Sequence, residues 1–386
     1  MNLLEKMKGV ETDESKVQKM FEGTVSARRK QETLKEAEQR GQILKCFDGT
    51  YPKHKSEFIL KEAMTTSDFP KIFGDILDRQ LLANYKVQSM PFRNYIKIST
   101  VRDFRDVKRF TTNGGDNVLS EVTQHGEYPE SSIGENSYSY AVKKYGRRIP
   151  FSWEAMINDD LDALKDIPQR FARAAARSEQ KFATELYTGT SGANDNVYTT
   201  GNGNIVSGNP SLDISALQTA FQTLANQTDS NGEPIMVEAV HLVVPPALEI
   251  TAQNILNSIQ LELNTAGGSS NQKLVTANWM KNRTTVHVDP YIPIVSSSSN
   301  GDTCWFLIAD PGNDRPAFEM GFLRGHESPE IFVKSPNARR PGGGDVDVMA
   351  GDFDTDAIQY KVRHVFGGTQ LDPKMTVASD GSDSAE

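Results

Sequence analysis

The fold is decided by YIKISTVRDFRDVKRF (Tyr95–Phe110) and SYSYAVKKYGRRIPFSW (Ser137–Trp153), two charged segments of similar length. The first alternates imperfectly, and at about 3.3 Å per residue each would reach roughly 50 Å as a strand. The Gly-, Asn- and Glu-rich segment between them, Thr112–Ser137, predicts a mobile loop at the tip of a hairpin. A two-stranded hairpin is marginally stable in water, and this one is too charged to be buried in its own domain. We therefore expect it to lie on another copy of the same chain.

Both arms of this hairpin carry basic residues, and its tip carries acidic ones. The candidate intersubunit residues are Arg102, Arg105, Lys108, Arg109, Glu121, Glu127, Glu130, Lys143, Lys144, Arg147 and Arg148. Their charges would complement a neighbour and set register and partner choice. A simpler interpretation is that they form solvated strand faces, which discourage edge-to-edge aggregation. DNA contact is a third interpretation, but no aromatic residues are interleaved with an open basic groove.

The clearest helix in the sequence follows the hairpin, at IPQRFARAAARSEQKFATELYTG (Ile167–Gly189). Asp166 is a good N-cap, Pro168 suits the first turn, and Gly189 is placed to end the helix. Such a helix would be roughly 30 Å long, and its alanines indicate close packing. Spacings of three and four predict a core-facing side made of Ile167, Phe171, Ala174, Ala175, Ser178, Phe182 and Leu186.

The rest of the chain divides into a charged beginning and a mixed end. Residues 1–64 have too few apolar positions for a core-facing stripe, which predicts a polar helix or flexible arm. An assembly arm, a removable scaffold-like segment and a disordered tail all fit this composition. Beyond it we expect helices at Thr65–Tyr85, Ser211–Gln227 and Pro245–Leu256, strands at Ala239–Val244, Thr285–Ile292, Cys304–Asp310 and Ala357–Asp372, a hairpin of Phe318–Gly325 with Glu330–Ser335, and a disordered tail at Val377–Glu386.

Composition narrows the class of protein. The 386 residues are enough for two or three domains, yet only 37% are hydrophobic, which suggests extended or partner-facing segments. A net charge of −9 argues against a dedicated nucleic-acid binder. Cys46 and Cys304 lack any metal or disulfide spacing. With neither a long apolar run nor a secretory signal, we expect a protein that stays in the cytoplasm where it is made, away from membranes.

Motifs for catalysis or metal binding are missing from the sequence. It contains no HExxH, GxSxG, Walker loop or well-placed GxGxxG, and the six histidines are scattered. Asp352, Asp354 and Asp356 mimic the start of a calcium loop, but Ala357 stands where glycine is required and Arg363 where glutamate is required. A solvated acidic loop explains them better, as it does Asp345 and Asp347. We expect no catalytic residues, no cofactor and no metal.

The order of these segments resembles the major capsid protein of tailed bacteriophages, which has the HK97-like fold. The resemblance runs from Thr65 to Leu371 through MTTSDFPKIFGDILDRQLLANY, the hairpin, IPFSWEAMINDDLDALKDIPQRFARAAARSEQKFATELYTG, HLVVPPALE, VDPYIP, CWFLIADPGNDRPAFEMGFLRGHESPEIFV and DTDAIQYKVRHVFGG. It implies an α+β chain divided into an N-terminal arm (1–64), a peripheral-domain entry helix (65–94), an extended loop (95–153), a peripheral domain with a spine helix (154–210), an axial domain (211–350), a peripheral return strand (351–376) and a tail (377–386).

The resemblance also implies a function. Hexamers and pentamers of the chain would tile an icosahedral shell around phage double-stranded DNA, without specific DNA binding. The shell would assemble in the host bacterial cytoplasm and form part of the virion. Scaffold, maturation protease, portal and decoration proteins are implied partners. Some relatives crosslink a lysine to an asparagine, but no motif assigns that role to Lys108, Lys143 or Asn337. An encapsulin-like compartment shell is the alternative, and an unrecognised hydrolase a remote one.

Overall fold

The computed structural model describes residues 79–383 apart from 89, 114–120, 123, 125–127, 129–133, 153–160, 230–231, 236, 238–239, 259, 265–272, 314 and 335–352. These residues combine helices with sheets, so the α+β expectation is confirmed. The chain divides into two compact units, unit 1 (Met1–Leu81, Arg148–Gln169 and Ile331–Val362) and unit 2 (Leu82–Arg147, Arg170–Glu330 and Arg363–Glu386). The expected arm, residues 1–64, lies outside the described residues, as does Thr65 to residue 78 of the first expected helix; residues 79–87 are helical.

The two long strands expected of the hairpin are each broken in two, so that prediction was wrong. β1 (Lys97–Val101) is followed by a bend and then β2 (Val107–Asn113). β3 (Gly134–Tyr140) is separated from β4 (Lys143–Ser152) at Ala141. The free hairpin therefore consists of β2 and β3 alone, and its 7-residue strands reach only about 23 Å.

The breaks occur because the bases of both arms belong to a larger sheet. Its strand order is β1-β12-β14-β13, and β4 also pairs with β14. β12 (Phe318–Leu323) runs parallel to β1 and antiparallel to β14 (Ala357–Gln370). β14 approaches the break at Ala141 closely, since a Cβ added at Gly367 would lie 2.5 Å from the Ala141 carbonyl oxygen.

The expected hairpin of Phe318–Gly325 with Glu330–Ser335 is also wrong. β12 and β13 (Glu330–Val333) do not pair with each other, because β14 stands between them in the strand order. β14 is 14 residues long, so several strands can pair with it along its length. The return strand itself was correctly predicted at Ala357–Asp372.

A second sheet of four strands forms the centre of unit 2. Its order is β10-β7-β11-β15, formed by β7 (Val240–Val244), β10 (Thr284–Val288), β11 (Trp305–Ala309) and β15 (Thr376–Ser379). The strands expected at Ala239–Val244 and Cys304–Asp310 are confirmed. The strand expected at Thr285–Ile292 ends earlier, at Val288, and Ile292 begins α10 (Ile292–Val295). The tail prediction is wrong, because β15 pairs antiparallel with β11 and is fully buried. Val377 and Ala378 supply apolar side chains to opposite faces of the sheet, which offsets the cost of ordering this short polar segment.

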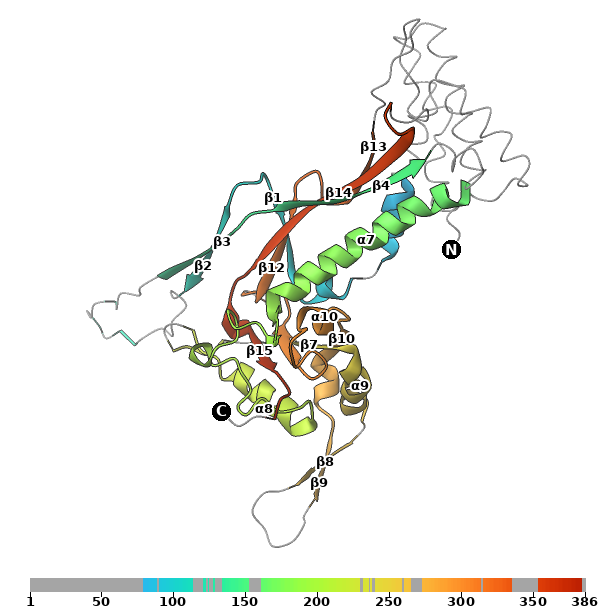
Figure 1. Ribbon diagram of the computed structural model, residues 1–386. Coiled ribbons are helices and arrows are strands. Elements are labelled where there is room, and N and C mark those ends of the chain that lie inside the picture. Colours follow the sequence, from blue (N-terminus) through green and yellow to red (C-terminus); the bar gives the residue numbers. More distant parts are fainter. Residues whose placement is uncertain are drawn as a thin grey trace, which may run out of the picture. The chain divides into compact units, whose positions relative to one another are not determined.

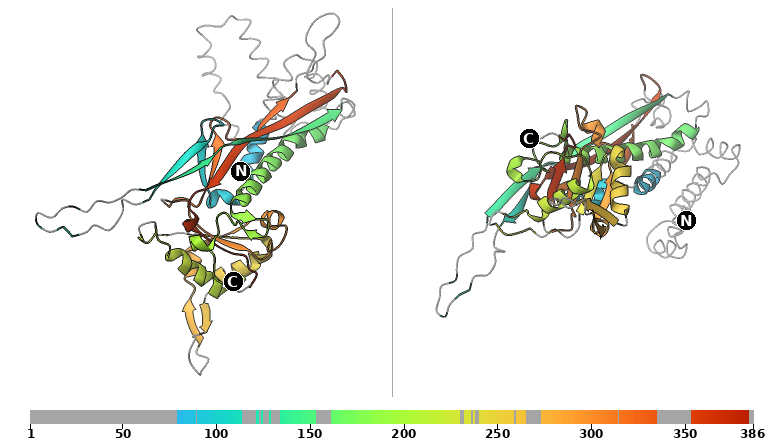
Figure 2. Two further views of the ribbon diagram at one scale, coloured as in Figure 1. Left: turned by 60° about the vertical axis from the view of Figure 1, so that its left-hand side comes forward. Right: turned by 90° about the horizontal axis from the view of Figure 1, so that it is seen from below.

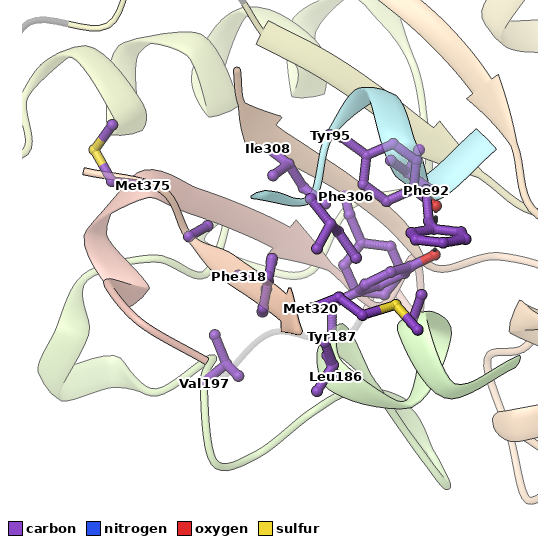
Figure 3. Packing of buried hydrophobic residues seen from close by; sticks show 14 of the residues in the cluster. Phe92, Tyr95, Leu186, Tyr187, Val197, Phe306, Ile308, Phe318, Met320 and Met375 are labelled. Atoms are coloured by element: carbon purple, nitrogen blue, oxygen red, sulfur yellow. Dashed lines mark hydrogen bonds between the residues drawn. The ribbon is translucent and has the colours of Figure 1, made fainter. Parts of the chain in front are cut away.

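Both faces of this second sheet are covered. On one face, Leu242 and Leu307 pack against α8 (Ile214–Ala225) and α9 (Glu249–Asn257) in one core cluster. On the other, Phe306 and Ile308 pack with the η2 turn (Pro91–Asn94), β12 and the last residues of the long helix (Figure 3). Burial on two faces explains why the two central strands, β7 and β11, are mostly apolar along their whole length.

The long helix begins earlier than its N-cap signal predicts. α7 spans Leu161–Tyr187, with Pro168 inside it rather than in the first turn (Figure 1). Ile167 and Phe171 are buried as expected, but Ser178 is exposed. The buried stripe instead includes four polar residues, Glu179, Gln180, Thr184 and Thr188 just after the helix, which an apolar count overlooks.

Smaller elements complete the described chain. A hairpin of β8 (Gln260–Asn264) and β9 (Lys273–Ala277), which no sequence signal predicted, extends from unit 2 (Figure 2). The helix expected to open at Pro245 is confirmed as a short turn followed by α9. The others are β5 (Thr188–Gly189), β6 (Gly192–Ala193), η3 (Thr200–Asn202), η4 (Pro246–Leu248), η5 (Met280–Asn282), α10 (Ile292–Val295) and η7 (Pro373–Met375).

Candidate functional site

The β2–β3 hairpin is the candidate site for assembly. Its strands pair from Val107 with Tyr140 to Asn113 with Gly134, and they pair with no other described strand. Alternation places Lys108 and Phe110 on one face, where both are exposed and Phe110 is 61% exposed. An apolar ring on a free hairpin lacks a covering surface within the described part of its own chain.

The other face of the hairpin is anchored to the five-stranded sheet. Glu319 in β12 is buried, and its Oε1 accepts hydrogen bonds from Ser99 Oγ (2.6 Å), Tyr140 OH (2.6 Å) and Arg109 Nε (2.8 Å). These donors lie on β1, β3 and β2, so hydrogen bonds to the Glu319 carboxylate link both arms of the hairpin to β12. The direction of the hairpin is thus fixed at its base.

The charge of Glu319 is part of this anchor. Burial disfavours the ionised carboxylate, but the hydrogen bonds from Ser99, Tyr140 and Arg109 more than compensate and hold the pKa of Glu319 below its ordinary value. A lowered pKa means that the contribution to stability is complete above about pH 4.3, the ordinary value for glutamate, and is lost as pH falls through the folded-state pKa. The anchor is therefore intact at neutral pH.

The structure places the expected intersubunit residues on different elements of the chain. Arg102 and Arg105 are exposed in the bend between β1 and β2. Arg109 is engaged by Glu319, so it serves its own subunit. The expectation that the second basic cluster lies on the free hairpin is wrong, because β4 pairs with β14; the exposed residues of that cluster are Lys143, Lys144, Arg147 and Arg148.

Of the expected acidic tip residues, Glu121 is exposed, while Glu127 and Glu130 lie outside the described residues. Tyr128, which lies between Glu127 and Glu130 in the sequence, is 82% exposed. The tip therefore adds a second exposed aromatic side chain to that of Phe110.

Glu179 and Asp289 are two further buried carboxylates that the sequence reasoning missed. Glu179 accepts hydrogen bonds from Tyr85 OH (2.5 Å) and Arg93 (3.1 Å), and lies 2.7 Å from His364 Nε2. Asp289 accepts hydrogen bonds from the side chains of Gln180, Thr184 and Tyr187 on α7. A signal was present, because polar residues recur at positions 180 and 184 on the same side of the helix as Ala172, Ala176 and Ala183.

His241 and His287 are packed against each other, with ring centroids 5.0 Å apart. His241 Nδ1 lies 3.0 Å from His287 Nε2, and its Nε2 lies 3.1 Å from Asp310 Oδ2. Burial, with the neighbouring His241, lowers the pKa of His287 to about 4, so its imidazole is neutral at physiological pH. Within the described ranges, no cluster of three or more His, Cys, Asp or Glu side chains could hold a metal ion. None of the helices described there is long and apolar enough to cross a membrane.

The described chain thus combines two sheets, a buried polar framework and an anchored hairpin that exposes Phe110. A family model described as phage capsid protein matches residues 135–379, well over half of the chain. The chain therefore belongs to the phage capsid protein family, and it is a major capsid shell protein. This agrees with the HK97-like resemblance of the sequence.

Solved structures similar to the chain are also capsid or phage structures. A Gordonia phage Cozz chain has 16% sequence identity and a TM-score of 0.43, and the match covers 73% of this chain and 83% of that chain. The capsid of an empty GTA particle has 11% identity and a TM-score of 0.46, with 76% of this chain and 90% of that chain covered. A Mycobacterium phage Ogopogo chain has 13% identity and a TM-score of 0.42, with 75% of this chain and 91% of that chain covered. No curated protein matches the chain. The family assignment rests on the family model.

Proposed function

We propose that the chain assembles into hexamers and pentamers that close an icosahedral shell around phage double-stranded DNA, and that the β2–β3 hairpin clamps a neighbouring subunit. The observation that carries the clamp is the hairpin itself, which pairs with no other described strand and leaves Phe110 uncovered. An isolated two-stranded hairpin gains little stability alone. Association covers the Phe110 ring, and many weak contacts per subunit add up through avidity.

The charge of the chain suits this function. Its net charge of −9 limits attraction to DNA, so a shell lining of this composition encloses DNA without specific binding. Residues 1–64 act in this proposal as an assembly arm or removable scaffold-like segment. Scaffold, maturation protease, portal and decoration proteins are the further partners, and assembly takes place in the host bacterial cytoplasm. The matched family favours a phage shell over an encapsulin-like compartment.

Shortening the hairpin tests the clamp. Residues 114–133 are replaced by Asn-Gly, which favours a tight two-residue turn between Asn113 and Gly134, the last cross-strand pair. The Glu319 anchor is untouched, so the subunit should fold with an unchanged melting temperature. We expect few or no closed shells by negative-stain microscopy, because the tip can no longer reach a neighbour. Normal shells from the shortened chain would refute the role of the hairpin as a clamp.

A further inference from the structure

A small cavity lies in unit 2, beside the bend that links β1 to β2. Its volume is about 200 Å³, and its walls are Phe104, Lys144, Leu323, His326, Arg363 and Val365. Pockets for cofactors and drug-sized ligands usually measure about 300 to 1,000 Å³. This cavity is therefore suited to a single inserted side chain.

The walls of the cavity combine apolar and basic groups. Leu323 and Val365 are buried, and the Phe104 ring is 54% exposed. Glu330 holds two of the basic groups in place, through Arg363 (2.6 Å) and His326 Nδ1 (2.5 Å). These walls suit an aromatic ring accompanied by a carboxylate.

Lys144 supplies the remaining positive charge of the cavity. It is exposed on β4, and no ion pair joins it to another described residue. A carboxylate arriving from outside would meet its ammonium group without displacing Glu330. Aromatic residues seated in pockets, with charged partners beside them, carry much of the energy of typical interfaces.

The tip of the hairpin contains a segment of this chemistry, Glu127-Tyr128-Pro129-Glu130. Tyr128 is 82% exposed. Glu130 follows Tyr128 by two residues in the sequence, so a carboxylate accompanies the aromatic ring. The bend adjoins Val107 at one end of the β2–β3 pairing, and the tip follows Asn113 at the other end, so a second copy is the suitable donor.

We propose that Tyr128 of one copy inserts into the Phe104–Lys144–Arg363 cavity of a neighbouring copy, with Glu130 paired to Lys144. This inference rests on the proposed clamp and names the surface that it grips. It also gives a partner to Lys144, which is exposed on β4 outside the free hairpin.

A charge exchange tests the pairing. Lys144→Glu and Glu130→Lys are each expected to raise the protein concentration needed for shell assembly by at least about tenfold, because each places like charges in contact. The double variant, which restores opposite charges at every interface, is expected to assemble at a concentration close to that of the unaltered protein. Lys143→Glu is the matched control, since it makes the same change in charge on the next residue of β4, outside the cavity.

Tyr128→Ala is expected to weaken assembly as strongly as either single charge reversal. Melting temperatures of the free subunits should be unchanged, because the altered side chains at 128 and 144 are exposed. Full assembly by Lys144→Glu, or a double variant no better than the single ones, would overturn the pairing. Either result would leave the clamp itself standing if the shortened hairpin still fails to form shells.

Discussion

Replacing Asp289 by alanine should lower the free energy of unfolding of the unassembled subunit by about 3–5 kcal/mol. Asp289 directly follows the last residue of β10, and it is fully buried. Its Oδ2 accepts hydrogen bonds from Gln180 Nε2 (2.9 Å), Thr184 Oγ1 (2.5 Å) and Tyr187 OH, and its Oδ1 from the Tyr291 backbone (2.8 Å). Alanine would remove the acceptor that these four donors share. Thr184 Oγ1 also reaches the Gln180 carbonyl oxygen, and Gln180 Nε2 and Tyr187 OH also reach Tyr95 OH, which limits the loss. Domains are stable by only about 5–15 kcal/mol.

Denaturant unfolding of the free subunit measures this loss. Asp302→Ala is the matched control, because Asp302 is exposed, and its effect should stay within about 0.5 kcal/mol. Asp289→Asn keeps the size and one acceptor oxygen, so its loss should be smaller than that of Asp289→Ala. A loss below about 1 kcal/mol for the alanine variant would contradict the role of Asp289 in joining α7 to β10.

The second large effect is expected at Glu179, where alanine should cost about 3 kcal/mol of unfolding free energy. The buried Glu179 carboxylate holds Tyr85, Arg93 and His364, which come from the segment before the hairpin and from β14. His364 is itself buried, so removing its acceptor leaves a polar ring without compensation. Arg93 is 41% exposed and can regain water, which limits the loss.

Glu185→Ala on the same helix is the control for Glu179. Glu185 is exposed, and its Oε1 lies 3.8 Å from Lys181 Nζ, one helical turn away. Such a pair contributes about 0.5 kcal/mol or less to the free energy of unfolding. The comparison separates loss of the buried carboxylate from loss of a helical glutamate. Equal effects at the two positions would show that the buried cluster does not hold the segment in place.

Apolar periodicity explains which parts of the fold the sequence could predict. Leu217, Phe221 and Leu224 recur at helical spacing, and α8 forms there with Asp213 as its N-cap. The continuous run in β7 reflects burial on both faces of the second sheet. The breaks at the bend and at Ala141 gave no such signal, because the segments on either side of each break are similarly charged and alternating. Their cause is pairing with β12 and β14, which are distant in sequence.

The internal contacts of the candidate site could not be predicted from the sequence. Charge clustering drew attention to Lys108 and Lys144, both of which are exposed. It could not show that Arg109 is engaged by Glu319, because that contact joins residues 210 positions apart. The buried carboxylates were hidden for the same reason, since local sequence does not show which glutamates of an amphipathic helix face the core.

The central claim is that this chain builds a closed shell from copies of itself. Negative-stain microscopy of the purified full-length chain, with sedimentation of the same sample, tests that claim most directly. We predict closed shells of uniform size, or ring-shaped capsomers that sediment as hexamers and pentamers. A chain that stays monomeric across the tested concentrations, with no particles in the images, would contradict it.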